Sequence, residues 1–446
     1  MIPGLPFKSR ETISAVQEAN FSRMMDLCFE RHPFYRAKFK ALGLSRGDIR
    51  SLEDIHLLPL VSKKEYASNP SAFSLETDGL EEEATIYWDV MHTTGTSGGR
   101  PTPFLSTTYD FYNTLTANQR ALEIRHVNGN DIVANLCPMT LHPYGAYHRT
   151  IAACNVMKIP VVSPLPGRPS DYFHWSASLD EVVDTIARTK ASILWGVTSY
   201  VRRILIRAEE VGADFSAVRL AFVTGEAVSE EMRRDLTERM RRTGRPDAWV
   251  SVSYAATEMQ VGTVECCPGS GYHNPAPDHF FFEVVDPESH KPLPAGQRGL
   301  SVLTHLDRRG TVLLRYSMGD FAALTYEQCP HCGSWTDRFV GMPSRADDLV
   351  KVKGMLINPE VITDLLLADG KVGEFQIIID RENANDILSS DRMRLLLDLK
   401  PDADPEAIAE SVRVATGVRP IIEKVERLQI FDPDRTLKAK RFKDLR

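Results

Sequence analysis

The chain lacks several features that define broad classes of protein. Its 446 residues contain no unbroken apolar run near 18 residues, so no membrane-spanning helix is expected. The N-terminus has no long apolar segment of the secretory kind. The formal net charge is -7, whereas nucleic-acid-binding proteins are usually basic. We therefore expect neither a membrane nor a nucleic acid as a partner.

Cysteine is scarce and irregularly spaced. The seven cysteines are odd in number and form no regular framework. This pattern fits reduced thiols better than disulfides, because disulfide-stabilised domains carry even sets of cysteines at regular spacing. We expect a cytoplasmic protein.

Apolar patterns predict an α/β fold. From about 130 to 260, short apolar runs such as Ile193–Val197 and Leu220–Val223 alternate with helical patterns, including 179–187 and 229–242. This alternation favours a largely parallel sheet covered on both faces. We expect an N-terminal domain over 1–345 with mixed or parallel sheets and a β subdomain at about 265–340. A small α+β domain is expected over 346–446.

The segment Thr93–Thr102 is rich in glycine and hydroxyl residues and contains Arg100. Glycine lets backbone N–H groups approach an anion, and hydroxyls add further donors. The composition suits a nucleotide triphosphate, but a surface turn has the same composition. The spacing is not that of the P-loop.

Polar residues follow several predicted strands. Gly225 and Glu226 follow one strand, and the next ends in Tyr254, Thr257 and Glu258. Such positions hold ligands at the carboxyl edge of parallel sheets. An aromatic ring can stack on a purine, a hydroxyl can donate to a phosphate, and a carboxylate can hold Mg²⁺. Plain strand connections are the alternative.

Three later segments carry further polar groups. Asp320 follows a tight turn, and one carboxylate can accept from both ribose hydroxyls. Arg345–Gly354 comes next along the chain. Thr436–Arg441 is basic, which taken alone is typical of a solvated end.

Together and in this order, the segments resemble the adenylate-forming acyl-CoA synthetase superfamily, most closely its phenylacetate–CoA ligase branch. The resemblance runs from Pro33–Arg36 to Lys438. It implies ATP-dependent activation of a carboxylic acid as acyl-AMP with release of pyrophosphate, followed by transfer to a phosphopantetheine thiol. The acceptor is CoA or, as in natural-product pathways, a carrier protein. Alternatives are an amide-forming ligase and a non-catalytic nucleotide- or acyl-binding regulator. For the assembly we consider a homodimer.

The resemblance also implies a role for individual residues. Residues that hold the phosphates of ATP are Thr93, Thr94, Gly95, Thr96, Ser97 and Gly98. The adenine slot comprises Gly225, Glu226, Ala227 and Tyr254. Thr257 contacts the α-phosphate, Glu258 binds Mg²⁺, and Asp320 and Arg345 hold the ribose. Asp347 is the hinge of a mobile C-terminal domain, in which Lys438 bridges substrate carboxylate and α-phosphate.

A Cys/His group suggests a metal. Cys329 and Cys332 have the C-x-x-C spacing of tetrahedral zinc sites, and Cys266 or Cys267 lies upstream with His273. A structural zinc held by three cysteines and one histidine is expected. Four unrelated residues in a reduced protein are the alternative.

The resemblance places an acyl pocket at His142, Tyr144, Gly145, Trp195 and Gly196. Aromatic walls with glycine gaps fit a flat ring, so we expect an aryl or arylacetic acid. Ordinary packing would account for the same residues.

Overall fold

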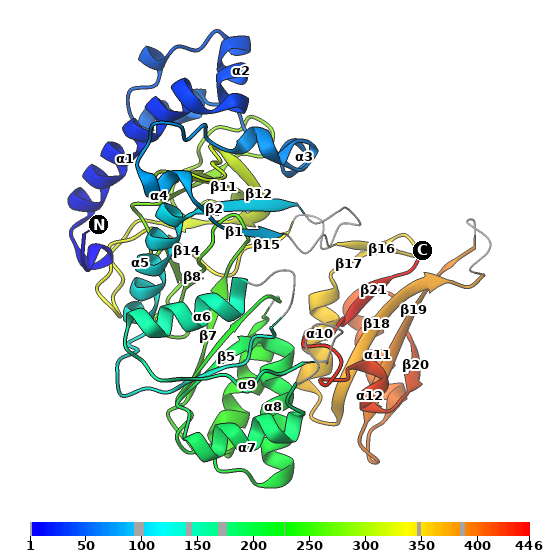
Figure 1. The fold of residues 1–446 in the computed structure, drawn as a ribbon. Coiled ribbons are helices and arrows are strands. Elements are labelled where there is room, and N and C mark those ends of the chain that lie inside the picture. Colours follow the sequence, from blue (N-terminus) through cyan, green and yellow to red (C-terminus); the bar gives the residue numbers. More distant parts are fainter. Residues whose placement is uncertain are drawn as a thin grey trace. The chain divides into compact units, whose positions relative to one another are not determined.

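A computed structural model describes residues 2–92, 102–139, 145–167, 176–226, 228–345, 349–383 and 389–446. The chain forms two compact units. Figure 1 colours the ribbon by position along the chain. The first comprises Met1–Asp131, Thr140–Pro160 and Ser251–Arg345, and the second Ile132–Met139, Val161–Val250 and Ala346–Arg446.

The first unit begins with two helices that break at a proline. α1 (Arg10–Arg31) starts after Ser9, whose side chain accepts from the Thr12 N–H, and α2 (Pro33–Leu42) has proline at its first turn. Proline disfavours helical backbone in the residue before it, so the chain bends at His32. The helices that follow in this unit are α3 (Lys63–Ser68), α4 (Glu82–Thr85), α5 (Thr108–Ile124) and α6 (Gly145–Val156). Short 3-10 turns occupy Leu5–Phe7, Arg46–Asp48, Leu52–Leu57 and Pro70–Phe73.

Antiparallel strands make up the rest of this unit. One four-stranded sheet has the order β10 (Phe280–Val285), β11 (Gly299–His305), β12 (Tyr316–Ala322) and β15 (Ser344–Arg345). β1 (Tyr87–His92) pairs with β2 (Pro103–Thr107). Short paired strands are β8 (Thr263–Val264), β9 (Tyr272–His273), β13 (Leu324–Thr325) and β14 (Arg338–Phe339). β7 (Trp249–Tyr254) passes from the second unit into the first.

The second unit contains the predicted parallel strands. β3 (Val133–Asn135) pairs in parallel with β4 (Val161–Val162) and β5 (Ile193–Val197), and β5 pairs with β6 (Leu220–Thr224). The intervening helices are α7 (Leu179–Thr189), α8 (Thr198–Val211) and α9 (Glu230–Arg242). α7 and α9 confirm the helices expected at 179–187 and 229–242.

The C-terminal segment of the second unit has its own sheet, with β20 (Ile421–Lys424), β19 (Asp391–Leu399), β18 (Val372–Arg381) and β21 (Phe442–Asp444) in that order. A hairpin of β16 (Val350–Val352) and β17 (Met355–Ile357) precedes it. Helices α10 (Pro359–Ala368), α11 (Pro405–Thr416) and α12 (Arg427–Ile430) complete the segment. Its apolar core is built from its own residues, among them Ile377, Leu395 and Val412.

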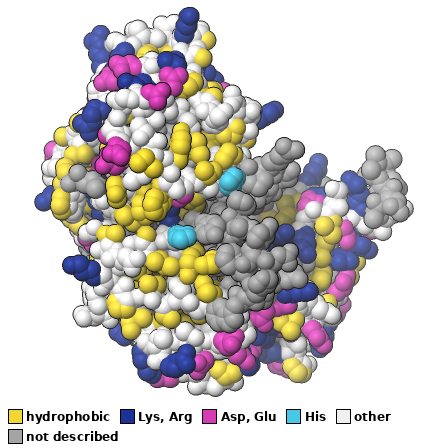
Figure 2. Space-filling view, in the orientation of Figure 1, with side chains coloured by type: hydrophobic (Ala, Val, Ile, Leu, Met, Phe, Trp, Pro, Cys, Tyr) yellow, Lys and Arg dark blue, Asp and Glu magenta, His cyan; other side chains and the backbone are white. Residues whose placement is uncertain are grey.

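The α/β fold class is confirmed by this arrangement. The predicted division into 1–345 and 346–446 stays a prediction: the compact units also change at Arg345, but the C-terminal segment is grouped with 161–250. Among the described residues, no helix has both the length and the apolar character needed to cross a membrane. On the face seen in Figure 2, acidic and basic side chains are interspersed rather than separated by sign.

One buried hydroxyl ties α2 to the start of β12. Tyr35 Oη donates to the Leu314 carbonyl at 3.1 Å and accepts from the Leu314 N–H at 2.6 Å. We expect Tyr35→Phe to lower the free energy of unfolding by about 1–3 kcal/mol, because two buried backbone groups lose their partner. Chemical denaturation measures the change.

Tyr112 offers a matched control, because its side chain is 51% exposed. Tyr112→Phe is expected to change the unfolding free energy by less than about 0.5 kcal/mol. Equal values for the two variants would contradict a stabilising role for the Tyr35 hydroxyl.

Candidate functional site

Ten predicted site residues lie outside the described part of the chain. They are Thr93, Thr94, Gly95, Thr96, Ser97, Gly98, His142, Tyr144, Ala227 and Asp347. The other predicted residues fall into separate groups within the two units.

In the first unit, the end of β7 meets β12 and β15. Tyr254 Oη donates to Asp320 Oδ2 at 2.6 Å, and Arg345 Nε lies 3.8 Å from Asp320 Oδ1. Asp320 and Arg345 are directly opposite each other in the antiparallel pair. Burial, followed by the nearby Asp320 carboxylate, raises the pKa of Tyr254 well above its usual value, so its hydroxyl stays protonated. The structure therefore brings three of the predicted ATP-binding residues together.

Glu258 is held by neutral donors. Its side chain is buried, and Tyr316 Oη donates to Glu258 Oε1 at 2.9 Å. His305 Nδ1 accepts from the Leu313 N–H at 3.0 Å, so Nε2 is the protonated nitrogen and donates to the Glu258 carbonyl, also at 3.0 Å. Burial lowers the pKa of His305 to about 3, which keeps the ring neutral. The carboxylate is thus fixed in place without a cation paired to it in these contacts.

The turn that carries Thr257 is braced from the following residues. Gln260 Nε2 donates to the Thr257 carbonyl at 2.6 Å, and Gln260 itself has a positive φ of 62°. Thr257 is half-buried. The turn therefore holds its backbone shape while leaving part of the Thr257 side chain accessible.

In the second unit, the turn after β6 lies beside the C-terminal segment. Gly225 has φ of +83°, and a Cβ built there would lie 3.6 Å from both Cε and Nζ of Lys438. Glu226 accepts from the Ser199 N–H at 2.7 Å and from Ser199 Oγ at 2.9 Å. Lys438, the lysine with the predicted bridging role, thus lies beside Gly225 and Glu226 of the predicted adenine slot.

The electrostatics of Glu226 reflect two opposing effects. Burial raises the pKa of its carboxyl group and is the largest cause. The Ser199 donors and the positive charges of Arg441 and Lys438 act against this shift. The environment of Glu226 therefore depends on the C-terminal segment.

The predicted acyl residues are divided between the units. Gly145 begins α6 in the first unit, whereas Trp195 and Gly196 lie on β5 in the second. A Cβ at Gly196 would lie 2.9 Å from Leu136 Cβ and 3.3 Å from Val201 Cγ2. Packing alone therefore explains this glycine, and its role in an acyl pocket stays a prediction.

Four predicted metal ligands converge in the first unit. One ligand atom from each of Cys266, His273, Cys329 and Cys332 lies within 4.8 Å of every other. Cys266 Sγ is 3.8 Å from Cys329 Sγ, and Cys332 Sγ is 3.7 Å from His273 Nε2. Zn–S bonds of about 2.3 Å in a tetrahedron give S–S edges of about 3.8 Å, so the spacing fits zinc. Of the two adjacent cysteines, Cys266 is the one in this group, and metal binding by the group stays a prediction.

Three residues of these groups carried no role in the sequence interpretation. Tyr316 holds Glu258, Ser199 holds Glu226, and Arg441 NH1 donates to Ser199 Oγ at 2.9 Å. Ser199 follows β5 as Gly225 follows β6, and the carboxyl ends of parallel strands meet at one edge. That topology was the available signal for Ser199.

Comparison with known proteins identifies the class. Residues 72–303 match the AMP-binding enzyme family, and because this range is more than half of the chain, the chain belongs to that family. The expected membership of the adenylate-forming enzymes is confirmed.

Named relatives point to one branch of that class. The chain is 26% identical to the phenylacetate-coenzyme A ligase of Thermus thermophilus over 390 residues, 86% of this chain and 82% of that protein. It is 21% identical to the phenylacetate-coenzyme A ligase of Escherichia coli over 388 residues, 85% of this chain and 82% of that protein.

Solved structures share the fold. A 2-hydroxyisobutyryl-CoA ligase in the postadenylation state, in complex with R3-HIB-AMP, has a TM-score of 0.78 at 22% identity, covering 100% of this chain and 94% of that one. ATP-bound MatB from Rhodopseudomonas palustris has a TM-score of 0.52 at 17% identity, covering 78% and 66%.

Proposed function

We propose that this protein is an AMP-forming acid–CoA ligase that activates an aryl or arylacetic acid. The observation that carries the proposal is the position of Lys438 at Gly225 and Glu226 in a member of the AMP-binding enzyme family. Support for CoA as acceptor comes from relatives named phenylacetate-coenzyme A ligase and from a 2-hydroxyisobutyryl-CoA ligase solved with 2-HIB-AMP and CoA. A carrier-protein acceptor, an amide product, a homodimer and a cytoplasmic location stay predictions.

The first half-reaction joins two anions. A carboxylate oxygen attacks the α-phosphorus of ATP, an O–P bond forms, and the bond to pyrophosphate breaks with its electron pair leaving on pyrophosphate. Lys438 offsets the repulsion between carboxylate and phosphate and the negative charge that develops during attack. Glu258 would hold Mg²⁺, which supplies further positive charge at the phosphates. Tyr316 orients the Glu258 carboxylate for this role.

Nucleotide binding falls to the remaining groups. Asp320 accepts from the ribose hydroxyls, with Tyr254 and Arg345 fixing its carboxylate. For adenine recognition we keep the assignment of Glu226 and Tyr254 that the family resemblance implies. In the second half-reaction a thiol sulfur attacks the acyl carbon, a C–S bond forms, the C–O bond to AMP breaks, and the thiol proton is lost to solvent.

Exchange of pyrophosphate into ATP tests the first half-reaction. We expect exchange with at least one member of a panel of benzoates and arylacetates, and product analysis with CoA, a carrier protein and amines then identifies the acceptor. Lys438→Ala is expected to lower exchange by about 100-fold or more, as for the loss of one preorganised charge-stabilising group, yet to retain transfer from supplied acyl-AMP.

Lys440→Ala is the matched control, because Lys440 is an exposed lysine two residues away. It is expected to retain exchange. Absence of exchange with every acid would overturn the proposed function, and equal loss of both half-reactions in Lys438→Ala would overturn the role of Lys438.

We also propose a structural zinc ion at Cys266, His273, Cys329 and Cys332. Four protein ligands leave no open position, so the ion would hold the short strands around β9 and β14 and take no part in the reaction. The purified protein is expected to contain about one zinc per chain.

Cys332→Ser is expected to lose most of this metal and to unfold at a lower temperature, because metal binding contributes directly to folding. Cys267→Ser, which changes the adjacent cysteine outside the four-residue set, is expected to keep it. Elemental analysis and thermal unfolding measure both effects. A metal-free wild type would contradict the assignment.

A further inference from the structure

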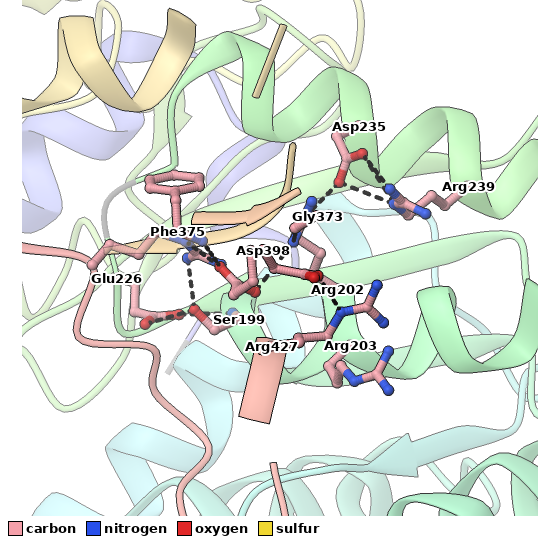
Figure 3. A network of polar contacts seen from close by, with 12 residues as sticks. Ser199, Arg202, Arg203, Glu226, Asp235, Arg239, Gly373, Phe375, Asp398 and Arg427 are labelled. Atoms are coloured by element: carbon pink, nitrogen blue, oxygen red, sulfur yellow. Dashed lines mark hydrogen bonds and ion pairs between the residues drawn. The ribbon is translucent and has the colours of Figure 1, made fainter. Parts of the chain in front are cut away.

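Beyond Lys438, the C-terminal segment contacts the strand ends through Arg441. Its guanidinium NH1 donates to Ser199 Oγ at 2.9 Å, while Ser199 Oγ donates to Glu226 Oε1 (Figure 3). The Arg441 carbonyl also accepts from the Ile377 N–H at 2.7 Å, which fixes this residue to β18. Three residues after Lys438, the chain is thus attached both to its own sheet and to the predicted adenine slot.

Arg441 also forms hydrogen bonds with Glu374. Arg441 donates to Glu374 Oε1 through NH2 at 3.0 Å and through Nε at 3.1 Å. The guanidinium carbon also lies 5.3 Å from the centroid of the Phe375 ring. The Glu374 side chain is only 3% exposed, so its charge depends on these partners.

A second buried arginine completes the chain of contacts. Arg202 NH1 lies 3.3 Å from Glu374 Oε2 and donates to the Gly373 carbonyl at 3.2 Å. Arg202 Nε donates to Asp235 Oδ2 on α9 at 2.7 Å. Figure 3 draws Arg202 together with Asp235 and Gly373. Polar contacts therefore form one continuous series, in which each residue contacts the next. The series is Glu226, Ser199, Arg441, Glu374, Arg202 and Asp235.

A more exposed bridge lies nearby. Arg427 NH1 is 2.8 Å from Glu210 on α8, and Arg427 Nε is 2.9 Å from Asp398 on β19. Its side chain is 30% exposed, compared with 13% for Arg441. Exposed ion pairs contribute little, so the buried contacts of Arg441 and Glu374 dominate.

We infer that Arg441 and Glu374 are positioning residues that hold Lys438 at Gly225 for acyl-AMP formation and release it for thiol transfer. We call the contacts of Arg441 and Glu374 with Ser199 and Arg202 the latch. The inference rests on the proposed function, in which Lys438 acts only in the first half-reaction. A latch of hydrogen bonds and ion pairs suits a reversible contact, because its groups can be rehydrated when it opens. Glu226 belongs to both the predicted adenine slot and the latch, so nucleotide binding and latching share one carboxylate.

The test compares the two half-reactions in Arg441→Gln and Glu374→Gln. We expect each to lower pyrophosphate exchange by about 10-fold or more, and to leave transfer from supplied acyl-AMP to CoA unchanged or faster. The double variant should be little worse than either single variant, because the two residues act on each other. Arg441→Lys keeps the charge but loses the two-point contact, and should restore part of the exchange.

Arg413→Gln is the matched control, because Arg413 pairs with Glu410 on α11 and its side chain is 48% exposed. It should leave both half-reactions unchanged. Equal loss of both half-reactions in Arg441→Gln and Glu374→Gln, or loss of neither, would overturn the latch.

Hydrogen exchange separates failure of the latch from failure of the proposed function. A wild type that exchanges no pyrophosphate with any acid contradicts the proposed function alone. The amides of residues 436–444 must still exchange about 10-fold faster in Arg441→Gln and Glu374→Gln than in Arg413→Gln. Equal rates of amide hydrogen exchange in the three variants would overturn the inference of a latch, whatever their enzymatic activity.

Discussion

A buried carboxylate has to be held by donors, and the candidate site depends on how this protein meets that requirement. Desolvation of an ionised carboxylate is costly unless hydrogen bonds or opposite charges compensate it. Glu226, Glu258 and Glu374 are all removed from most contact with solvent. Each is held by residues distant in sequence, so the carboxylates fix the relative positions of strand ends, helices and the C-terminal segment within each unit.

The type of donor separates two uses of these carboxylates. Ser199 and Tyr316 are neutral, so neither of these donors places a positive charge beside Glu226 or Glu258. Glu374 lies between Arg441 and Arg202, whose charges compensate its own. A carboxylate neutralised in this way has little left to offer a ligand, which is why we assign Glu374 to positioning. Asp320 combines both types, with a hydroxyl from Tyr254 and the more distant guanidinium of Arg345.

Local signals made much of the fold predictable. Ser62 and Glu65 form a capping box at the spacing typical of a helix start. Apolar periodicity located α7 and α9 because each buries one face. The set of Cys and His residues that converge was also visible in the sequence. The choice between Cys266 and Cys267 was not, because adjacent residues differ only in the direction that the folded turn gives their side chains. The Ser199–Arg441 contact joins residues 242 positions apart, a separation on which local patterns carry no information.

Local sequence patterns and contacts distant in sequence also differ on where the C-terminal segment begins as a separate unit. Sequence patterning marks a boundary near Arg345, whereas compactness joins the C-terminal segment to the region of α8 and α9. The nature of the contacts reconciles the two. The segment buries Ile377, Leu395 and Val412 in a core made of its own residues, while hydrogen bonds and ion pairs of Arg441, Glu374 and Arg427 attach it to α8. An apolar core shared between two parts resists separation because opening it exposes apolar surface to water. A polar attachment can exchange its partners for water, whereas movement of this segment as a domain stays a prediction.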